Sequence, residues 1–203
     1  LGCSETIVHT WFSEFLTSAK RAFPNVTIEM TVDTSYRLID MLSKNELDLA
    51  IHMHETNDPE QATLWLCKYQ LFLFTSRNKK NHESYSVEDL QGEQIITFPR
   101  KTRPYRQLKN LLSHKPLGIN LNGISSLYTI IKLAVDGVGI ASLPREVIRE
   151  PIENKRLFPM KTDFLLDPLE FKVSFRKTPL NVEFAQIAEE VASRHDSKLR
   201  DVL

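Results

Sequence analysis

The sequence predicts an α/β protein made of two lobes, each built on a mainly parallel sheet. Short apolar strands alternate with amphipathic helices along the whole chain, a polar stretch at 77–86 separates two such series, and 203 residues are enough for two small lobes. We place residues 1–76 and 177–203 in lobe I and residues 77–176 in lobe II. Neither a solenoid repeat nor a low-complexity tract contradicts this division.

The first series opens with a long helix. Apolar residues recur at helical spacing over Glu5–Phe23, and Pro24 ends the pattern. Oxygens at Asp33–Ser35 can cap a second helix, and Asn45 is suited to the left-handed backbone at its end. Alternating or short apolar runs predict four strands, at Val26–Val32, Leu47–Met53, Thr63–Tyr69 and Leu71–Ser76.

The second series repeats the alternation on a smaller scale. A helix over Pro104–His114 has proline in its first turn, and another begins after Ser125 or Ser126 and ends at Gly137. An amphipathic helix over Phe184–Ala192 closes the chain. Four strands are predicted between these helices, at Ile95–Phe98, Gly118–Asn122, Val138–Leu143 and Glu170–Arg176.

Composition argues against several classes of protein. Lysine plus arginine equals aspartate plus glutamate at 26 each, so the chain lacks the basic excess of a surface dedicated to nucleic-acid phosphates. It has no apolar run of membrane-spanning length and no export signal at its start. Cys3 and Cys67 lie far apart without metal-ligand spacing, so we expect two buried thiols in a reducing, cytoplasmic compartment. Because the chain starts at Leu1, we expect another segment to precede it.

Several short motifs stand in register along the whole chain. They are Gly2-Cys3-Ser4-Glu5-Thr6, Phe23-Pro24-Asn25-Val26, Glu46-Leu47-Asp48-Leu49-Ala50-Ile51, Val87-Glu88-Asp89-Leu90 and Asp136-Gly137-Val138-Gly139-Ile140-Ala141-Ser142-Leu143-Pro144. Together these motifs resemble the effector-binding domains of LysR-type transcription regulators. Val87-Glu88-Asp89-Leu90 is similar to a turn of that family, and Asn45 departs mildly from the family's usual glycine.

The resemblance implies a type 2 periplasmic-binding-protein-like fold. Two Rossmann-like lobes would be joined by crossover strands, near Phe74–Arg77 and Phe175–Thr178, with a small-molecule effector in the cleft between them. It also implies a homodimer or tetramer, with the helices at Glu5–Phe23 or Arg106–His114 as candidate contacts. DNA would be bound only through a winged helix-turn-helix that precedes these residues, and no membrane is implied.

Physical reasoning independent of the family points to the same kind of site. In open parallel sheets, ligands bind beyond the carboxyl ends of strands, where helix N-termini gather. Such junctions occur at Ser4–Thr6, Asp33–Ser35, Phe98–Thr102 and Gly123–Ser126. Their amide donors and helix dipoles favour an anion, so a small carboxylate or similar acid is expected.

The candidate effector-binding residues supply hydroxyl groups, backbone amides and positive charge at these junctions. Arg100, Lys101 and Arg103 could pair with a carboxylate, although such loop residues are equally often solvated charges. The serines and threonines could also be plain helix caps, a role compatible with ligand binding. The full set is Ser4, Thr6, Thr34, Ser35, His52, Phe98, Pro99, Arg100, Thr102, Ser125 and Ser126.

Three other interpretations have less support. His52 and His54 could share one face of a strand, but no third metal ligand is suitably spaced, so His52 is better interpreted as a cleft-lining hydrogen-bonding residue. Motifs for hydrolase, nucleotide or zinc chemistry are missing, so we expect no enzyme and no cofactor, although enzymes can share the fold. A solute-binding protein of a transport system would share the cleft but should carry an export signal.

Overall fold

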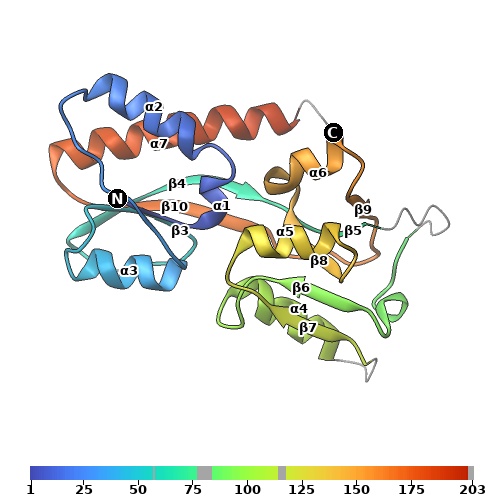
Figure 1. Ribbon diagram of the computed structural model, residues 1–203. Coiled ribbons are helices and arrows are strands. Elements are labelled where there is room, and N and C mark those ends of the chain that lie inside the picture. The colour runs from blue at the N-terminus through green and yellow to red at the C-terminus, as the bar shows by residue number, and fades with distance from the viewer. Residues whose placement is uncertain (57, 77–83, 114–117, 201–203) are drawn as a thin grey trace. The chain divides into compact units, whose positions relative to one another are not determined.

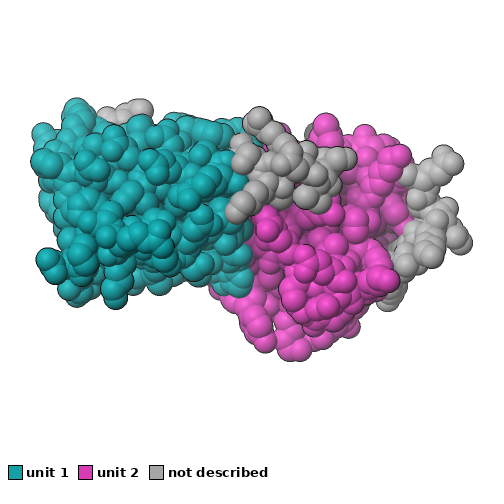
Figure 2. Space-filling model, turned by 90° about the horizontal axis from the view of Figure 1, so that it is seen from above, with its two compact units in different colours: residues 1–68, 170–203 teal, residues 69–169 magenta. Residues whose placement is uncertain are grey.

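In a computed structural model, the chain forms two compact units (Figures 1 and 2). The structure describes residues 1–56, 58–76, 84–113 and 118–200. Unit 1 comprises Leu1–Lys68 and Glu170–Leu203, and unit 2 comprises Tyr69–Leu169. The chain therefore passes from one unit to the other twice, at 68/69 and at 169/170.

Unit 1 is built on a mixed sheet with the strand order β2-β1-β3-β10-β4. Strands β1 (Gly2–Cys3), β2 (Thr31–Val32) and β3 (Leu49–His52) are parallel. Strand β10 (Leu169–Arg176) is antiparallel to β3, and β4 (Gln61–Tyr69) forms the far edge.

Helices cover both faces of this sheet. Figure 1 shows α2 (Phe12–Ala22) and α7 (Pro179–Arg200) side by side on one face and α3 (Ser35–Ser43) on the other. The ring of Phe15 on α2 meets the ring of Phe184 on α7 edge-on, with centroids 6.3 Å apart. On the opposite face, Leu38 and Leu42 of α3 pack against Ala50 of β3. The apolar positions that predicted these helices therefore build the core of unit 1.

Unit 2 contains the second mixed sheet, with the strand order β7-β6-β8-β5-β9. Strands β6 (Gln94–Thr97), β7 (Asn120–Gly123) and β8 (Ile140–Pro144) are parallel. Strand β5 (Leu71–Thr75) is antiparallel to both β8 and β9 (Phe158–Met160). The helical elements of this unit are 3₁₀ turns at Glu88–Leu90 and Arg145–Ile148, α4 (Arg103–Ser113), α5 (Leu127–Val135) and α6 (Arg149–Glu153).

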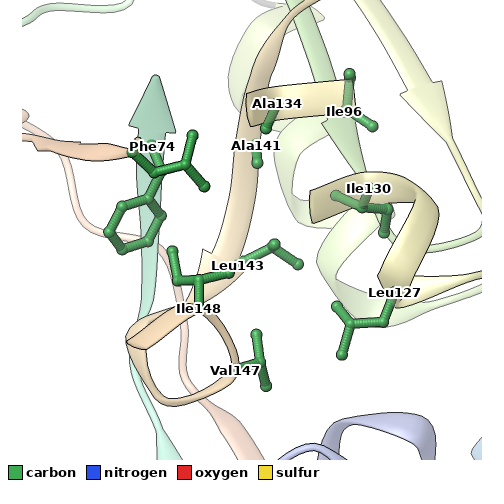
Figure 3. Close-up of a cluster of buried hydrophobic side chains, with 10 residues drawn as sticks. Phe74, Ile96, Leu127, Ile130, Ala134, Ala141, Leu143, Val147 and Ile148 are labelled. Carbon is green, nitrogen blue, oxygen red and sulfur yellow. The ribbon is translucent and has the colours of Figure 1, made fainter. Parts of the chain in front are cut away.

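One apolar cluster joins α5 to this sheet. Figure 3 shows Leu127, Ile130 and Ala134 of α5 directed toward side chains of β5, β6 and β8. These α5 residues follow one another at the spacing of a single helix face, which is the pattern that predicted the helix. The buried members are Phe74, Ile96, Leu127, Ile130, Ala134, Ala141, Leu143, Val147, Ile148 and Leu157.

Helix ends follow the predicted chemistry in three places. Asn45 has a φ of 60°, the left-handed conformation expected after α3, and Gly137 has a φ of 77° after α5. Of the two serines that could cap α5, Ser126 does so, because its Oγ accepts a hydrogen bond from the Thr129 amide at 3.3 Å.

Several boundaries differ from the sequence predictions. The helix expected over Glu5–Phe23 is interrupted after α1 (Glu5–Val8), where the Thr10 hydroxyl donates to the carbonyls of Thr6 and Ile7 at 3.1 Å. The strand expected at Val26–Val32 shortens to β2, because only Thr31 and Val32 pair with β1. The crossover expected near Phe74–Arg77 and the helix expected over Pro104–His114 end at Arg77 and His114, which lie outside the described residues.

The division between the units also lies elsewhere than at 76/77 and 176/177. Strand β5 pairs with β8 and β9, so the chain has already entered unit 2 at Tyr69. Strand β10 pairs with β3, so the return to unit 1 comes at Glu170, at the start of the strand rather than after it. Strand pairing, which sequence periodicity does not reveal, sets both crossings.

Candidate functional site

The carboxyl ends of the three parallel strands of unit 1 are joined by hydrogen bonds. The Ser4 amide, after β1, donates to the Ile51 carbonyl at 3.1 Å, and the Asp33 amide, after β2, donates to the Cys3 carbonyl at 3.3 Å. The Met53 amide, after β3, donates to Ser35 Oγ at 3.0 Å. The structure thus brings the predicted residues Ser4, Thr34 and Ser35 to one edge of the sheet.

The Ser4 side chain is the least satisfied group at this edge. Ser4 is only 6% exposed, and its Oγ has no hydrogen-bond partner among the described residues. A buried hydroxyl without a partner costs about 1–3 kcal/mol, so this position favours a bound group that can exchange a hydrogen bond. Thr6, which follows within α1, is also buried.

The first turn of α3 has no side-chain cap. Thr34 occupies the N-cap position, but its hydroxyl instead contacts Asp33 Oδ1 at 3.2 Å. The prediction that oxygens at Asp33–Ser35 cap this helix is therefore wrong: no side chain makes the capping hydrogen bond, and the Ser35 hydroxyl accepts from the Met53 amide instead. Amide donors in the first turn of α3 are consequently not taken by a cap, and they add to the positive end of the helix dipole.

An aromatic pair that the sequence analysis missed lies beside these residues. The rings of Tyr36, at the start of α3, and His54, after β3, meet edge-on with centroids 6.4 Å apart. Both side chains are exposed. Tyr36 gave no signal in the sequence because it falls outside the apolar face of its helix.

His52 is placed differently from its predicted role. Its side chain is fully buried, its Nδ1 accepts a hydrogen bond from the His54 amide at 3.1 Å, and its Nε2 lies 2.8 Å from Ser174 Oγ. Ser174 Oγ lies in turn 2.7 Å from the Thr63 hydroxyl. With both ring nitrogens engaged inside unit 1, His52 is a structural residue of the sheet and not the effector-binding residue that the sequence predicted.

The His52–Ser174 pair is not arranged for nucleophilic catalysis. Because Nδ1 accepts the backbone amide proton, the ring proton is assigned to Nε2, which then donates to Ser174. A base for serine would need the opposite arrangement, with a free lone pair on Nε2. Burial lowers the His52 pKa to about 4, which keeps the ring neutral, and Ser174 is also fully buried.

In unit 2, the ends of β6 and β7 also meet. The Ile124 amide donates to the Thr97 carbonyl at 2.9 Å, and a Cβ on Gly123 would lie 3.0 Å from the Arg100 amide nitrogen and 3.1 Å from the Phe98 carbonyl oxygen. Glycine at 123 therefore allows the loop after β6 to lie against the end of β7. The predicted residues Phe98, Pro99, Arg100 and Thr102 come together with Ser125 in this region.

Some polar side chains of this region bind other groups of the fold, and others are exposed. The Thr102 hydroxyl donates to the Pro99 carbonyl at 2.6 Å, and Ser126 caps α5, so both have structural roles. Arg103 pairs with Asp167, with Nη2 and Oδ2 3.3 Å apart. The side chains of Arg100, Lys101 and Ser125 are exposed. Within the described part of unit 2, a ligand could therefore reach these three side chains without displacing a hydrogen bond of the fold.

Two other kinds of feature are absent from the part of the chain that the structure describes. Among residues 1–56, 58–76, 84–113 and 118–200, no three histidine, cysteine, aspartate or glutamate side chains are grouped to hold a metal ion. Within the same residues, no helix has both the length and the apolar character needed to cross a bilayer.

Comparison with known proteins identifies similar domains. The chain matches the family of LysR substrate binding domains over residues 1–178. That family has a type 2 periplasmic-binding-protein-like fold, so the predicted fold is confirmed. No curated protein matches the chain significantly.

Solved structures agree over nearly the whole chain. The effector binding domain of QuiR, in complex with shikimate, has a TM-score of 0.76 at 15% identity, covering 96% of both chains. The regulatory domain of MetR from N. meningitidis has a TM-score of 0.74 at 18% identity, covering 96% of this chain and 93% of that one. A sulfate-bound mutant regulatory domain of OxyR2 from Vibrio vulnificus has a TM-score of 0.75 at 18% identity, covering 95% and 93%.

Proposed function

The chain belongs to the family of LysR substrate-binding domains, and we propose that it binds a small anionic effector through the strand-end loops of its units. The family match makes it the ligand-sensing part of a LysR-type transcription regulator. Support for a small-molecule ligand comes from the QuiR domain, which is similar in fold and carries shikimate.

The Ser4 hydroxyl carries this proposal. It is buried, has no partner among the described residues, and follows β1 at the edge where the uncapped first turn of α3 begins. Groups that can exchange hydrogen bonds are rarely left in this state unless a bound molecule or water satisfies them. An effector oxygen at this edge would accept from both the hydroxyl and the α3 amides.

The effector class follows from the charges. Arg100 and Lys101 are exposed in the loop after β6, and the helix dipole at the start of α3 favours negative charge. Hydroxyls and backbone amides accompany these cations at the strand ends. Carboxylates lie there too: Asp33 accepts from the Thr34 amide at 2.6 Å and pairs with Arg37, and Glu5 Oε1 lies 3.9 Å from His9 Nε2. A small carboxylate fits this set better than a cation does.

Binding would regulate transcription by shifting a conformational equilibrium. If the chain has two arrangements, an effector shifts the equilibrium toward one of them only to the extent that it binds that arrangement more tightly than the other. We propose that DNA is bound by a winged helix-turn-helix preceding residue 1, in a cytoplasmic protein that catalyses no reaction. The match to a family of regulator domains, rather than of enzymes, supports the last of these points.

We also propose that the chain forms a homodimer or a tetramer of such dimers. Edge strand β2 is short, and two apolar residues are exposed there, Met30 directly before the strand and Val32 within it. Apolar residues at an open sheet edge are a common place for association between chains. Sedimentation of the chain at high concentration should give a dimer, and a strict monomer would contradict this part of the proposal.

A thermal-shift screen against small metabolite acids tests the central claim. A ligand that binds only the folded chain raises the unfolding temperature with the logarithm of its concentration. For an acid that does so, calorimetry on Ser125→Ala should show affinity reduced about tenfold, because one hydrogen bond is lost while the fold is kept. Ser113→Ala, an exposed serine on α4, is the control. Unchanged affinity in Ser125→Ala would remove Ser125 from the site, and a screen without any responding acid would contradict the anionic class.

A further inference from the structure

Gln70 links the two connections through which the chain passes between its units. It lies between β4 and β5, directly after the first crossing at 68/69. Its side-chain amide donates to the Leu71 carbonyl at 3.3 Å and also to the carbonyl of Leu166. Leu166 lies three residues before β10, directly ahead of the second crossing at 169/170. One side chain therefore holds both connections together inside unit 2.

The segment that approaches the second crossing is anchored at both ends. We call residues Lys161–Pro168, between β9 and β10, the strap. At its start, the Tyr85 amide donates to the Lys161 carbonyl at 2.8 Å, and the Asp163 amide donates to the Tyr85 carbonyl at 3.0 Å. At its end, Leu166 is held by Gln70 and Asp167 is held by Arg103.

The Arg103–Asp167 pair connects the strap to the first residue of α4. The two side chains are 64% and 56% exposed, so water and salt compete with the pair and it adds little to stability. A contact of this strength can be replaced by another anion at modest cost. Arg103 also lies in the loop-to-helix junction after β6 that carries Arg100 and Lys101, the exposed cations of the proposed site.

We propose that Gln70, Leu166, Asp167 and Arg103 form a hinge clasp, which transmits a change at the start of α4 to both connections between the units. An anion that takes Arg103 from Asp167 frees the end of the strap, and the Gln70 contact passes this change to the first connection. The sensing role of the clasp rests on the proposed function, but its mechanical coupling does not. All four residues belong to unit 2.

Hydrogen–deuterium exchange on the ligand-free chain tests the coupling. Arg103→Gln removes the charge that holds Asp167 and so imitates the loss of Arg103 to an anion. It should speed amide exchange about twofold to fivefold in two peptides, one spanning 161–169 and one spanning 69–75, because breaking an exposed ion pair shifts local opening by about that factor. Arg106→Gln, an exposed arginine one turn along α4, is the matched control and should change neither peptide.

A double variant tests whether the change reaches the first connection through Gln70. In a Gln70→Ala background, Arg103→Gln should still speed exchange in the strap but should no longer alter residues 69–75, because the link between the connections is gone. An effect on 69–75 that persists without Gln70, or equal effects of Arg103→Gln and Arg106→Gln, would overturn the clasp. Because no ligand is present, failure of the anion proposal in the thermal-shift screen leaves this result interpretable.

Discussion

The Nε2 atom of His52 lies 2.8 Å from Oγ of Ser174, and both side chains are fully buried. The pair joins β3 to β10, and the contact from Ser174 to Thr63 extends it to β4. A row of hydrogen-bonded polar side chains thus links three neighbouring strands of unit 1, in addition to their backbone hydrogen bonds. Such a network requires a neutral His52, because a proton on Nδ1 would oppose the His54 amide.

The stability of the chain should fall on acidification through His52. Burial lowers its pKa from 6.5 to about 4 in the folded state, so between these values the unfolded chain binds the proton more readily. The free energy of unfolding therefore decreases as the pH falls from about 6.5 to about 4, by at most roughly 3 kcal/mol from this residue. Urea unfolding measured at several pH values checks this expectation.

A His52→Gln variant separates this effect from the titration of carboxylates. It should be less stable than the original chain at pH 7.5, because the network is disturbed, yet lose less stability on going to pH 4.5. The informative quantity is the difference between the two pH profiles. Parallel profiles would show that His52 does not titrate in this window.

Removing the Ser4 hydroxyl should affect binding and stability in opposite directions. Ser4→Ala deletes a buried group that has no partner among the described residues, so the unfolding temperature should stay the same or rise. Affinity for an acid found by thermal shift should fall about tenfold. Ser13→Ala, an exposed serine on α2, provides the comparison. A clear loss of stability in Ser4→Ala would assign the hydroxyl to the fold rather than to the effector.

Two glycines should respond differently to alanine. A Cβ at Gly139 would lie 2.6 Å from the Gln94 carbonyl oxygen of β6, so Gly139→Ala forces the backbone apart and should cost about 2–3 kcal/mol of unfolding free energy. Gly92 has a φ of 75° and open space around it, so Gly92→Ala should cost about 1 kcal/mol, from backbone strain alone. Denaturant unfolding of both variants checks this expectation. Equal losses of unfolding free energy in the two variants would contradict the steric role of Gly139.

The thiol of Cys3 should be inert in the native chain. Burial raises its pKa to about 12, and its side chain is inaccessible to solvent. At pH 8 a thiol reagent should therefore label Cys3 only after unfolding in urea, since the thiolate is the reacting form. Rapid labelling of Cys3 under native conditions, located by mass spectrometry, would show that β1 opens far more often than its burial implies.

Local sequence predicted most of the helices and strands but few of their partners. The periodicity of Leu127, Ile130 and Ala134 predicted α5 because a helix that packs on a sheet must keep one apolar face. The short strand β9 and helix α6 gave no such signal, since Phe158–Met160 and Arg149–Glu153 are too short for a period to register. Polar residues after strands indicated the candidate site, but their hydrogen-bond partners come from distant segments.

The sequence by itself determined the α/β class, the order of the elements, the left-handed position of Asn45 and the family. These depend on residues near one another along the chain. Tertiary structure alone decided that His52 is a buried structural residue, that Arg103 is held by Asp167, and that the crossings lie at 68/69 and 169/170. Each of these depends on which strands and loops pair over long sequence separations, and a local hydrophobic pattern carries no information about that choice.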